Sequence, residues 1–224
     1  MPTFLVVNAD DLGYDPAIDA GILEAHARGI VTAATAMVDT PFAERALGEA
    51  PVTLDLGLHV AVAAGEGGGP AALADDIARQ LERFRALRGA PPTHLDSHRH
   101  SHAAPGALGA FAEAARREGI PLRALDAGMR AALRARGVAT ADAFLGDAIL
   151  RPCWTRERLL ATIAALPAGV VELMCHPGHA PTHARTSFAA ERELELAALC
   201  DPAARLALTA AGAVLGSFAG RPHA

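Results

Sequence analysis

Residues 4–13 read FLVVNADDLG, an apolar run that passes directly into two neighbouring carboxylates. The apolar part has the length and composition of a buried β-strand, and Asp10 and Asp11 stand at its carboxyl end. Asp15-Pro16 follows as an N-cap with proline at the first helical position. A strand that leads into a helix through polar residues is typical of a βα unit.

The same alternation of short apolar runs with longer Ala-, Leu- and Arg-rich segments continues along the chain. It predicts a parallel sheet with helices between its strands. The expected strands are 4–9, 32–38, 54–59, 93–96, 122–125, 170–174 and 213–215. The expected helices are 15–29, one that starts at 40–41, 71–88, 106–118, 155–166, 191–199 and 202–211, and the segment 126–150 is ambiguous.

Polar residues at the ends of several strands decide between two folds. These residues are Asp10 and Asp11, His59, Asp96 and His98, and His176. In (β/α) barrels, catalytic groups come from the carboxyl ends of different strands and converge on one mouth. A doubly wound sheet would gather them at one switch point instead. We therefore expect an α/β fold, a compact (β/α) barrel, complete or incomplete, as a single domain over residues 1–224.

Composition narrows the class of protein. Hydrophobic residues make up 51% and charged residues 20%, which supplies a core and argues against disorder. The net charge of -5 argues against a nucleic-acid partner, and no run reaches the roughly 18 apolar residues of a membrane span. All 20 basic residues are Arg, which excludes a Schiff-base lysine and a P-loop. The 3 Cys are widely spaced and predict no disulfide framework, so we expect a cytoplasmic protein.

The segment 94–102 reads HLDSHRHSH and gathers four imidazoles and one carboxylate. Histidine is the commonest metal ligand, and its neutral form is available at physiological pH. A carboxylate such as Asp96 beside ligand histidines can fix their tautomer through the other ring nitrogen. The alternative is a solvated polar loop, and the density of imidazoles favours a metal site.

The remaining candidates each have a competing structural interpretation. Asp10 and Asp11 alternate along an extended segment, so one can ligate a metal while the other transfers protons. The dipeptide alone more often caps the next turn, with Gly13 supplying an unusual backbone torsion. His59 ends an apolar strand, where a lone His is more often a buried core residue than a ligand.

Residues 175–178 read CHPG after a strongly apolar strand. Pro177-Gly178 predicts a turn that places the imidazole of His176 at the mouth of the barrel. Cys175 is expected to be a small buried hydrophobe rather than a nucleophile. His179 and His183 are expected in a solvated loop.

Together, NADDLG at 8–13, GLH at 57–59, THLDSHRHSH at 93–102 and CHPG at 175–178 resemble the YdjC-like family of carbohydrate deacetylases. Any one of these motifs is weakly specific. Four of them in the family's order, spanning residues 3–178, are highly specific, and the rest of the chain is similar only in general character.

The resemblance implies a barrel of the glycoside hydrolase/deacetylase type that removes an N-acetyl group from an acetylated amino sugar or oligosaccharide. It implies one divalent metal ion, magnesium or zinc, and a metal-bound water as the nucleophile. The implied ligands are Asp11, His59 and His98, with Asp10 as the catalytic base and His176 as the acid. The family is often dimeric, so a homodimer belongs to this expectation. Further candidates, for supporting the ligands or contacting substrate, are Asp96, His94, His100, His102 and Tyr14.

Other functions share part of this pattern. A metal hydrolase of a non-sugar amide or a phosphoester would use the same metal site, and phosphate would call for Arg at the mouth, where Arg99 and Arg151 are the candidates. A catalytically silent, metal-stabilised binding protein would not need both Asp10 and His176. The short segments 61–75 and 126–155 leave little chain for loops over the pocket, and aromatic residues make up only 4%. Of these, Tyr14 and Trp154 are the candidates for stacking on a sugar, with core or rim packing as the competing role.

Overall fold

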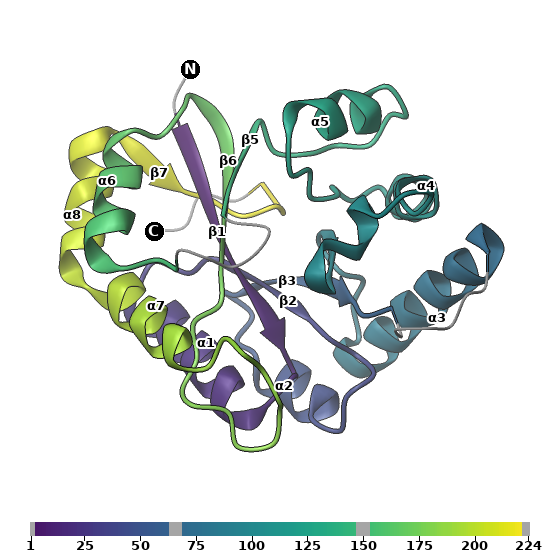
Figure 1. Ribbon diagram of the computed structural model, residues 1–224, viewed down its shortest axis with the longest axis horizontal. Coiled ribbons are helices and arrows are strands. Elements are labelled where there is room, and N and C mark those ends of the chain that lie inside the picture. Colours follow the sequence, from purple (N-terminus) through teal and green to yellow (C-terminus); the bar gives the residue numbers. More distant parts are fainter. Residues whose placement is uncertain (1–2, 63–68, 147–152, 221–224) are drawn as a thin grey trace.

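A parallel β-sheet forms the centre of the molecule, and β1 (Thr3–Leu12) runs through its middle (Figure 1). The computed structural model describes residues 3–62, 69–146 and 153–220. The other strands are β2 (Ala33–Ala36), β3 (Asp55–Val60), β4 (Leu95–Ser97), β5 (Ala143–Leu145), β6 (Gly169–Cys175) and β7 (Ala213–Leu215). Their order is β4-β3-β2-β1-β6-β5, and β7 pairs with β1.

Helices surround this sheet, with α6, α7 and α8 to one side of β1 and α3 and α4 to the other in Figure 1. The helices are α1 (Pro16–Arg28), α2 (Ala43–Glu49), α3 (Pro70–Arg88), η1 (His98–Ala103), α4 (Leu108–Glu118), α5 (Ala127–Arg134), α6 (Arg156–Ala164), α7 (Ala190–Cys200) and α8 (Pro202–Ala211). None of the described helices is long and apolar enough to cross a membrane.

The sequence of β1 suits a strand covered on both faces. Residues 5–12 are all buried, as expected for a central parallel strand. β6 pairs with β1 from Thr3 to Ala9, β7 pairs with it at 3–5, and β2 pairs with it only from Asn8 onward. The neighbours of β1 therefore change along its length.

The barrel is incomplete, which confirms the expected fold class. The two ends of the sheet are β4 and β5. The strand expected at 122–125 is wrong, since the only pairing there is an isolated bridge between Leu95 and Leu122. The backbone N–H of Leu122 turns instead to the carbonyl of Ala139, and Pro121 has no N–H to extend a ladder.

Most other elements lie within a few residues of their predicted bounds. The second helix begins later than expected, at Ala43 rather than at 40–41. The Thr40 hydroxyl donates to the Gly13 carbonyl, and its oxygen accepts the N–H of Phe42 just before the helix. The expected cap of α1 is confirmed: the Asp15 carboxylate accepts the N–H of Ala17. The ambiguous segment 126–150 contains α5 and β5, and its residues 147–150 lie outside the described part of the chain.

Candidate active site

The carboxyl ends of four strands converge on one cavity of about 330 Å³. Asp10 and Asp11 come from β1, His59 from β3, His98 directly follows β4, and His176 directly follows β6. These five side chains and those of Tyr14 and His100 all line the cavity. The structure thus brings together residues up to 166 positions apart, as the barrel interpretation predicted.

The two neighbouring aspartates point to different parts of the cavity. Asp11 has a φ of 74°, in the left-handed region that few non-glycine residues adopt. At the same place the pairing of β1 with β2 shifts register between Ala9 and Leu12. The capping alternative is wrong, because Asp15 caps α1 while Asp10 and Asp11 bond to side chains of the cavity. The positive φ of Asp11 is a strained conformation for a non-glycine residue. Strain of this kind persists where the surrounding structure enforces it, often at functional sites.

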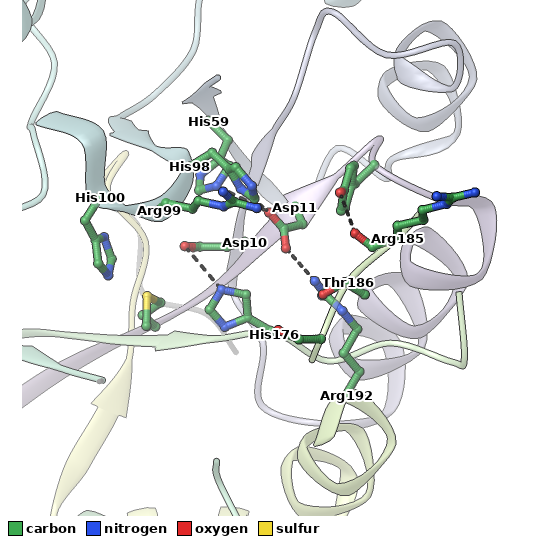
Figure 2. A pocket seen from close by; sticks show the side chains of 13 residues that line it. Asp10, Asp11, His59, His98, Arg99, His100, His176, Arg185, Thr186 and Arg192 are labelled. Atoms are coloured by element: carbon green, nitrogen blue, oxygen red, sulfur yellow. Dashed lines mark hydrogen bonds and ion pairs between the residues drawn. The ribbon is translucent and has the colours of Figure 1, made fainter. Parts of the chain in front are cut away.

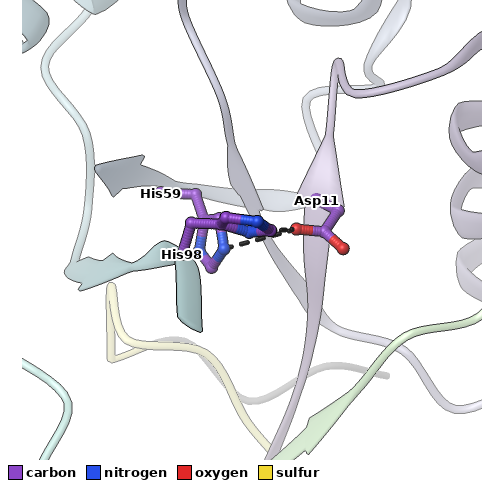
Figure 3. A group of neighbouring side chains, drawn as sticks. All are labelled: Asp11, His59 and His98. Carbon is purple, nitrogen blue, oxygen red and sulfur yellow. Dashed lines mark hydrogen bonds and ion pairs between the residues drawn. The ribbon is translucent and has the colours of Figure 1, made fainter. Parts of the chain in front are cut away.

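Asp11, His59 and His98 form a compact group of ligand atoms (Figure 3). Asp11 Oδ1 lies 3.4 Å from His59 Nε2 and 3.2 Å from His98 Nδ1. Tetrahedral ligands at the usual zinc distances of about 2.0–2.1 Å are about 3.3 Å apart. The three atoms therefore have the spacing and the chemistry of a divalent-metal site with room for further ligands.

Asp96 supports His59 from behind, in the position expected of a carboxylate that fixes a ligand histidine. His59 Nδ1 donates to Asp96 Oδ1 at 2.6 Å, which turns Nε2 toward Asp11. Burial disfavours a charged His59, but Asp96, Asp11 and Asp10 raise its pKa to about 10. The site therefore favours a positive charge at this point, which a metal ion would supply.

A second group, Asp10 with His59 and Asp96, also has ligand atoms close together. Here the cation is already present, because the buried Arg123 guanidinium lies 2.7 Å from Asp10 Oδ2 and 2.8 Å from Asp96 Oδ2. Arg123 also contacts Glu172 Oε1 at 2.7 Å. The first group is therefore the better candidate for a metal site.

Asp10 lies beside His176 on the other side of the cavity (Figure 2). His176 Nε2 is 3.8 Å from Asp10 Oδ2. Arg123 holds the pKa of Asp10 far below its usual range despite the opposing effect of burial. Burial lowers the pKa of His176 to about 4, so its imidazole is neutral near neutral pH.

Comparison with known proteins places this geometry in a family. A family model described as YdjC-like protein matches residues 4–210. The chain belongs to the YdjC-like family. It is 32% identical to a carbohydrate deacetylase of Geobacillus stearothermophilus over 90% of this chain and 91% of that protein. It is 30% identical to a chitooligosaccharide deacetylase of Serratia marcescens over 97% and 99% of the two chains.

A solved structure supports the fold of this YdjC-like chain. It comes from Enterococcus faecalis V583 and is described as a candidate cellobiose-phosphate cleavage protein. The two structures align with a TM-score of 0.87 at 25% sequence identity, over 98% of each chain.

The sequence pattern of this YdjC-like chain did not reveal several residues that shape its cavity. Arg123 holds Asp10, and Arg192 Nη2 donates to Asp11 Oδ2 at 2.6 Å. Glu195 accepts the backbone N–H of His176 at 2.6 Å and that of Trp154 at 3.0 Å. For Arg123 one signal existed, a lone charge in the apolar run 120–125. Arg192 and Glu195 lie in an ordinary charged helix, where nothing distinguishes them.

The segment that follows β6 forms one wall of the cavity. Arg185, Thr186 and Ser187 line it, together with Arg99 and Arg192. The expectation of Arg99 and Arg151 at the mouth is therefore incomplete, and Arg151 lies outside the described residues. The wall is fixed by Asp15, whose Oδ2 accepts the backbone N–H groups of 182, 183 and 184 at 2.6–3.0 Å.

The remaining predicted residues fall into two groups. Tyr14 lines the cavity with its ring centroid 5.9 Å from that of His98, while Trp154 is buried in the core. Cys175 is a buried core residue, as predicted. His102 is fully buried and lies within hydrogen-bond distance of the Ser97 hydroxyl, and His94 is buried behind Asp10.

Proposed function

We propose that this protein is a metal-dependent hydrolase that removes an N-acetyl group from an acetylated amino sugar. One observation carries the proposal: a group of metal-ligand type, Asp11 with His59 and His98, shares a cavity with Asp10 and His176. The names of the relatives, carbohydrate deacetylase and chitooligosaccharide deacetylase, agree with this chemistry.

Hydrolysis of an amide needs an activated water, stabilisation of the oxyanion and a proton for the leaving amine. A divalent ion held by Asp11, His59 and His98 would polarise the acetyl carbonyl and acidify a water. Arg192 fixes the second oxygen of Asp11, which leaves Oδ1 directed toward the two imidazoles. This orientation keeps the ligand set together.

Proton transfer falls to Asp10 and His176. Arg123 keeps Asp10 ionised, so its Oδ2 can accept the proton of the attacking water. His176 is neutral at the outset and its Nε2 lies 3.8 Å from that oxygen. His176 can therefore take up this proton and donate it to the departing amine nitrogen, which leaves an acetate and a free amino sugar.

The cavity suits a small substrate. Its volume of about 330 Å³ lies at the lower end of the range for small-molecule sites. Tyr14 is the one tyrosine of the chain, and it offers a ring at the rim next to His98. We therefore propose that a mono- or disaccharide is the substrate rather than a long oligosaccharide.

A second candidate is hydrolysis of a phosphorylated sugar. Within the described residues, no carboxylate pairs with the side chains of Arg99 and Arg185, which both line the cavity. The description of the Enterococcus faecalis relative also mentions a sugar phosphate. A silent binding protein is disfavoured because Asp10 and His176 would have no use beside the metal group.

One experiment separates these functions. The purified protein is incubated with acetylated mono- and disaccharides and with sugar phosphates, with and without chelator, while acetate and phosphate are quantified. We expect chelator-sensitive acetate release. Phosphate release would favour the second candidate, and neither product with metal bound would favour a binding protein. Elemental analysis of the active protein decides between magnesium and zinc.

The homodimer implied by the family resemblance and the cytoplasmic location expected from the cysteine pattern are also part of this proposal. Light scattering of the purified protein tests the dimer, and fractionation of the source cells tests the location.

A further inference from the structure

Three residues of the sequence motifs have no part in the mechanism above: Asn8 of NADDLG, Gly57 of GLH and His94 of THLDSHRHSH. The structure brings them together behind Asp10. His94 Nε2 lies 2.8 Å from Asn8 Oδ1, and Asn8 Nδ2 lies 2.8 Å from Asp10 Oδ1. Asn8 is fully buried and His94 is 2% exposed, so water does not compete for these bonds.

The negative charge of Asp10 determines which group donates and which accepts in the hydrogen bonds that link Asp10, Asn8 and His94. An ionised carboxylate only accepts, so the Asn8 amide must turn its Nδ2 toward Asp10 and its Oδ1 toward His94. His94 must then carry its proton on Nε2, which leaves Nδ1 as an acceptor. The Thr93 hydroxyl lies 2.9 Å from Nδ1 and 3.1 Å from the Leu56 carbonyl, and its proton is shared between these two acceptors. Burial lowers the pKa of His94 to about 4, so its ring stays neutral.

The imidazole of His94 is held in place from several sides. The Phe218 ring stacks on it, with centroids 4.1 Å apart. A Cβ at Gly57 would lie 2.6 Å from its ring atoms. Gly57 has no positive φ that would itself require glycine, so the close approach of His94 explains this residue.

We propose that His94 and Asn8 are positioning residues for Asp10, whose carboxylate they orient toward the cavity. Asn8 Nδ2 donates to Asp10 Oδ1 alone, whereas Arg123 donates to both oxygens, from Nη2 to Oδ1 and from Nη1 to Oδ2. Oδ2 is the oxygen on the side of His176, 3.8 Å from Nε2. Arg123 supplies charge to three carboxylates, whereas the amide of Asn8 supplies a directed neutral bond. The inference rests on the proposed function, because Asp10 is taken as the general base.

Two amide substitutions of His94 test the proposal as a matched pair. In His94→Gln the amide nitrogen can occupy the place of Nε2 and still donate to Asn8. His94→Asn is too short to do so, while both variants lose the stacking on Phe218. We expect His94→Asn to lower kcat about 10- to 100-fold with KM and metal affinity unchanged, and His94→Gln to stay within about threefold of the unaltered enzyme.

A double variant separates positioning from a general structural effect. If His94 acts through Asp10, then His94→Asn adds no further loss of kcat in an Asp10→Asn background. Equal losses in both His94 variants, or losses that multiply in the double variant, would overturn the proposal.

Imidazole ¹⁵N NMR of the unaltered protein tests the hydrogen-bond chain without turnover. We expect a neutral His94 with its proton on Nε2, protected from exchange. An Nδ1–H tautomer would overturn the proposal whatever the substrate is. Absence of acetate release by the unaltered, metal-loaded protein would instead reject the proposed function. The NMR result would still decide whether His94, Asn8 and Asp10 are linked by hydrogen bonds in the proposed direction.

Discussion

The side of the cavity around Asp11 and the side around Asp10 meet at the carboxyl end of β1. The two sides differ in how they balance the negative charge of these aspartates. On the Asp11 side, the pKa of His59 is raised to about 10 because Asp96 and Asp11 outweigh its burial. On the Asp10 side, burial lowers the pKa of His176 to about 4, and the cation is the permanent charge of Arg123. Arg192 is a fixed cation beside Asp11, but it pairs with Oδ2 and leaves Oδ1 and the two imidazoles for a removable cation. Arg123, in contrast, pairs with both oxygens of Asp10.

The largest effect is expected from loss of the cation on the Asp11 side. Chelation should remove the metal ion and with it nearly all acetate release. His98→Ala should have the same effect, because only two of the three protein ligands, Asp11 and His59, are left to hold the ion. Metal content and acetate release measure this. His179→Ala is the matched control, since that imidazole is half exposed and pairs with Glu24 outside the cavity. Full activity in His98→Ala would contradict the ligand assignment.

Removal of Arg123, the fixed cation on the Asp10 side, should lower the free energy of unfolding. Arg123→Met leaves Asp10, Asp96 and Glu172 buried without their partner. Breaking a buried ion pair in this way typically costs about 3–5 kcal/mol, which urea unfolding measures. Arg134→Met removes a half-exposed pair with Asp142 and should cost less than about 1 kcal/mol. Similar losses in the two variants would show that Arg123 does not neutralise this side.

The two sides should also respond to opposite ends of the pH scale in the metal-free protein. His176 has a folded pKa of about 4, below the unfolded value of about 6.5, so its contribution to stability is lost as pH falls from about 6.5 to 4. Burial also lowers the pKa of His94 and His100 to about 4 and that of His102 to about 3, so these residues add to the same acid limb. His59 has a folded pKa of about 10, so its contribution is lost as pH rises from about 6.5 to 10. Unfolding free energies across this range measure both limbs.

The same unfolding measurements with a divalent metal ion added test which part of the pH dependence belongs to the metal site. A cation bound at His59 replaces its proton, so metal should flatten the alkaline limb. At acid pH, protons compete with the metal for the two imidazoles, so the stabilisation by metal should decrease there. Glu172 and Glu195, whose pKa burial raises to about 7, oppose the acid limb, so the difference between loaded and metal-free protein is the quantity to compare. An alkaline limb that metal does not change would separate His59 from the metal site.

The smallest effect concerns the wall beside Arg192. Asp15→Asn keeps an N-cap for α1 but loses the charge that three backbone N–H groups share. We expect KM to rise up to about tenfold, roughly 1.4 kcal/mol of substrate binding, with a smaller change in kcat. Asp201→Asn is the matched control, because Asp201 caps α8 with the same Asp-Pro arrangement and does not contact the wall. Equal changes in both variants would reject the anchoring role.

The sequence predicted one side of the cavity better than the other, for a physical reason. Asp11, His59 and His98 lie in the motifs that carry the family resemblance, which implied them as ligands, and each stands at or directly after the end of a strand. Arg123 reaches Asp10 across 113 positions, and Arg192 reaches Asp11 across 181. Their local patterns are those of an irregular segment and of an ordinary amphipathic helix, so only the tertiary arrangement reveals them.

The predicted strands also differ in how well they agree with the structure. Strands with a continuous apolar run, such as β1 and β6, lie close to their predicted bounds. The strand expected over 122–125 fails because its pairing depends on a neighbour at Ala139 that is itself irregular. The neutrality of His176 likewise follows from its burial, to which the Phe188 ring 5.6 Å away belongs and which the motif CHPG does not encode.

The division of work between the neighbouring aspartates is tested most directly by comparing two isosteric variants. Metal affinity, by calorimetry, and acetate release are measured in Asp10→Asn and Asp11→Asn. We predict that Asp10→Asn binds metal with unchanged affinity but loses about 10³-fold in turnover, as expected for removal of a general base. Asp11→Asn should lose metal binding itself. Loss of metal in Asp10→Asn, or full turnover in either variant, would contradict the account.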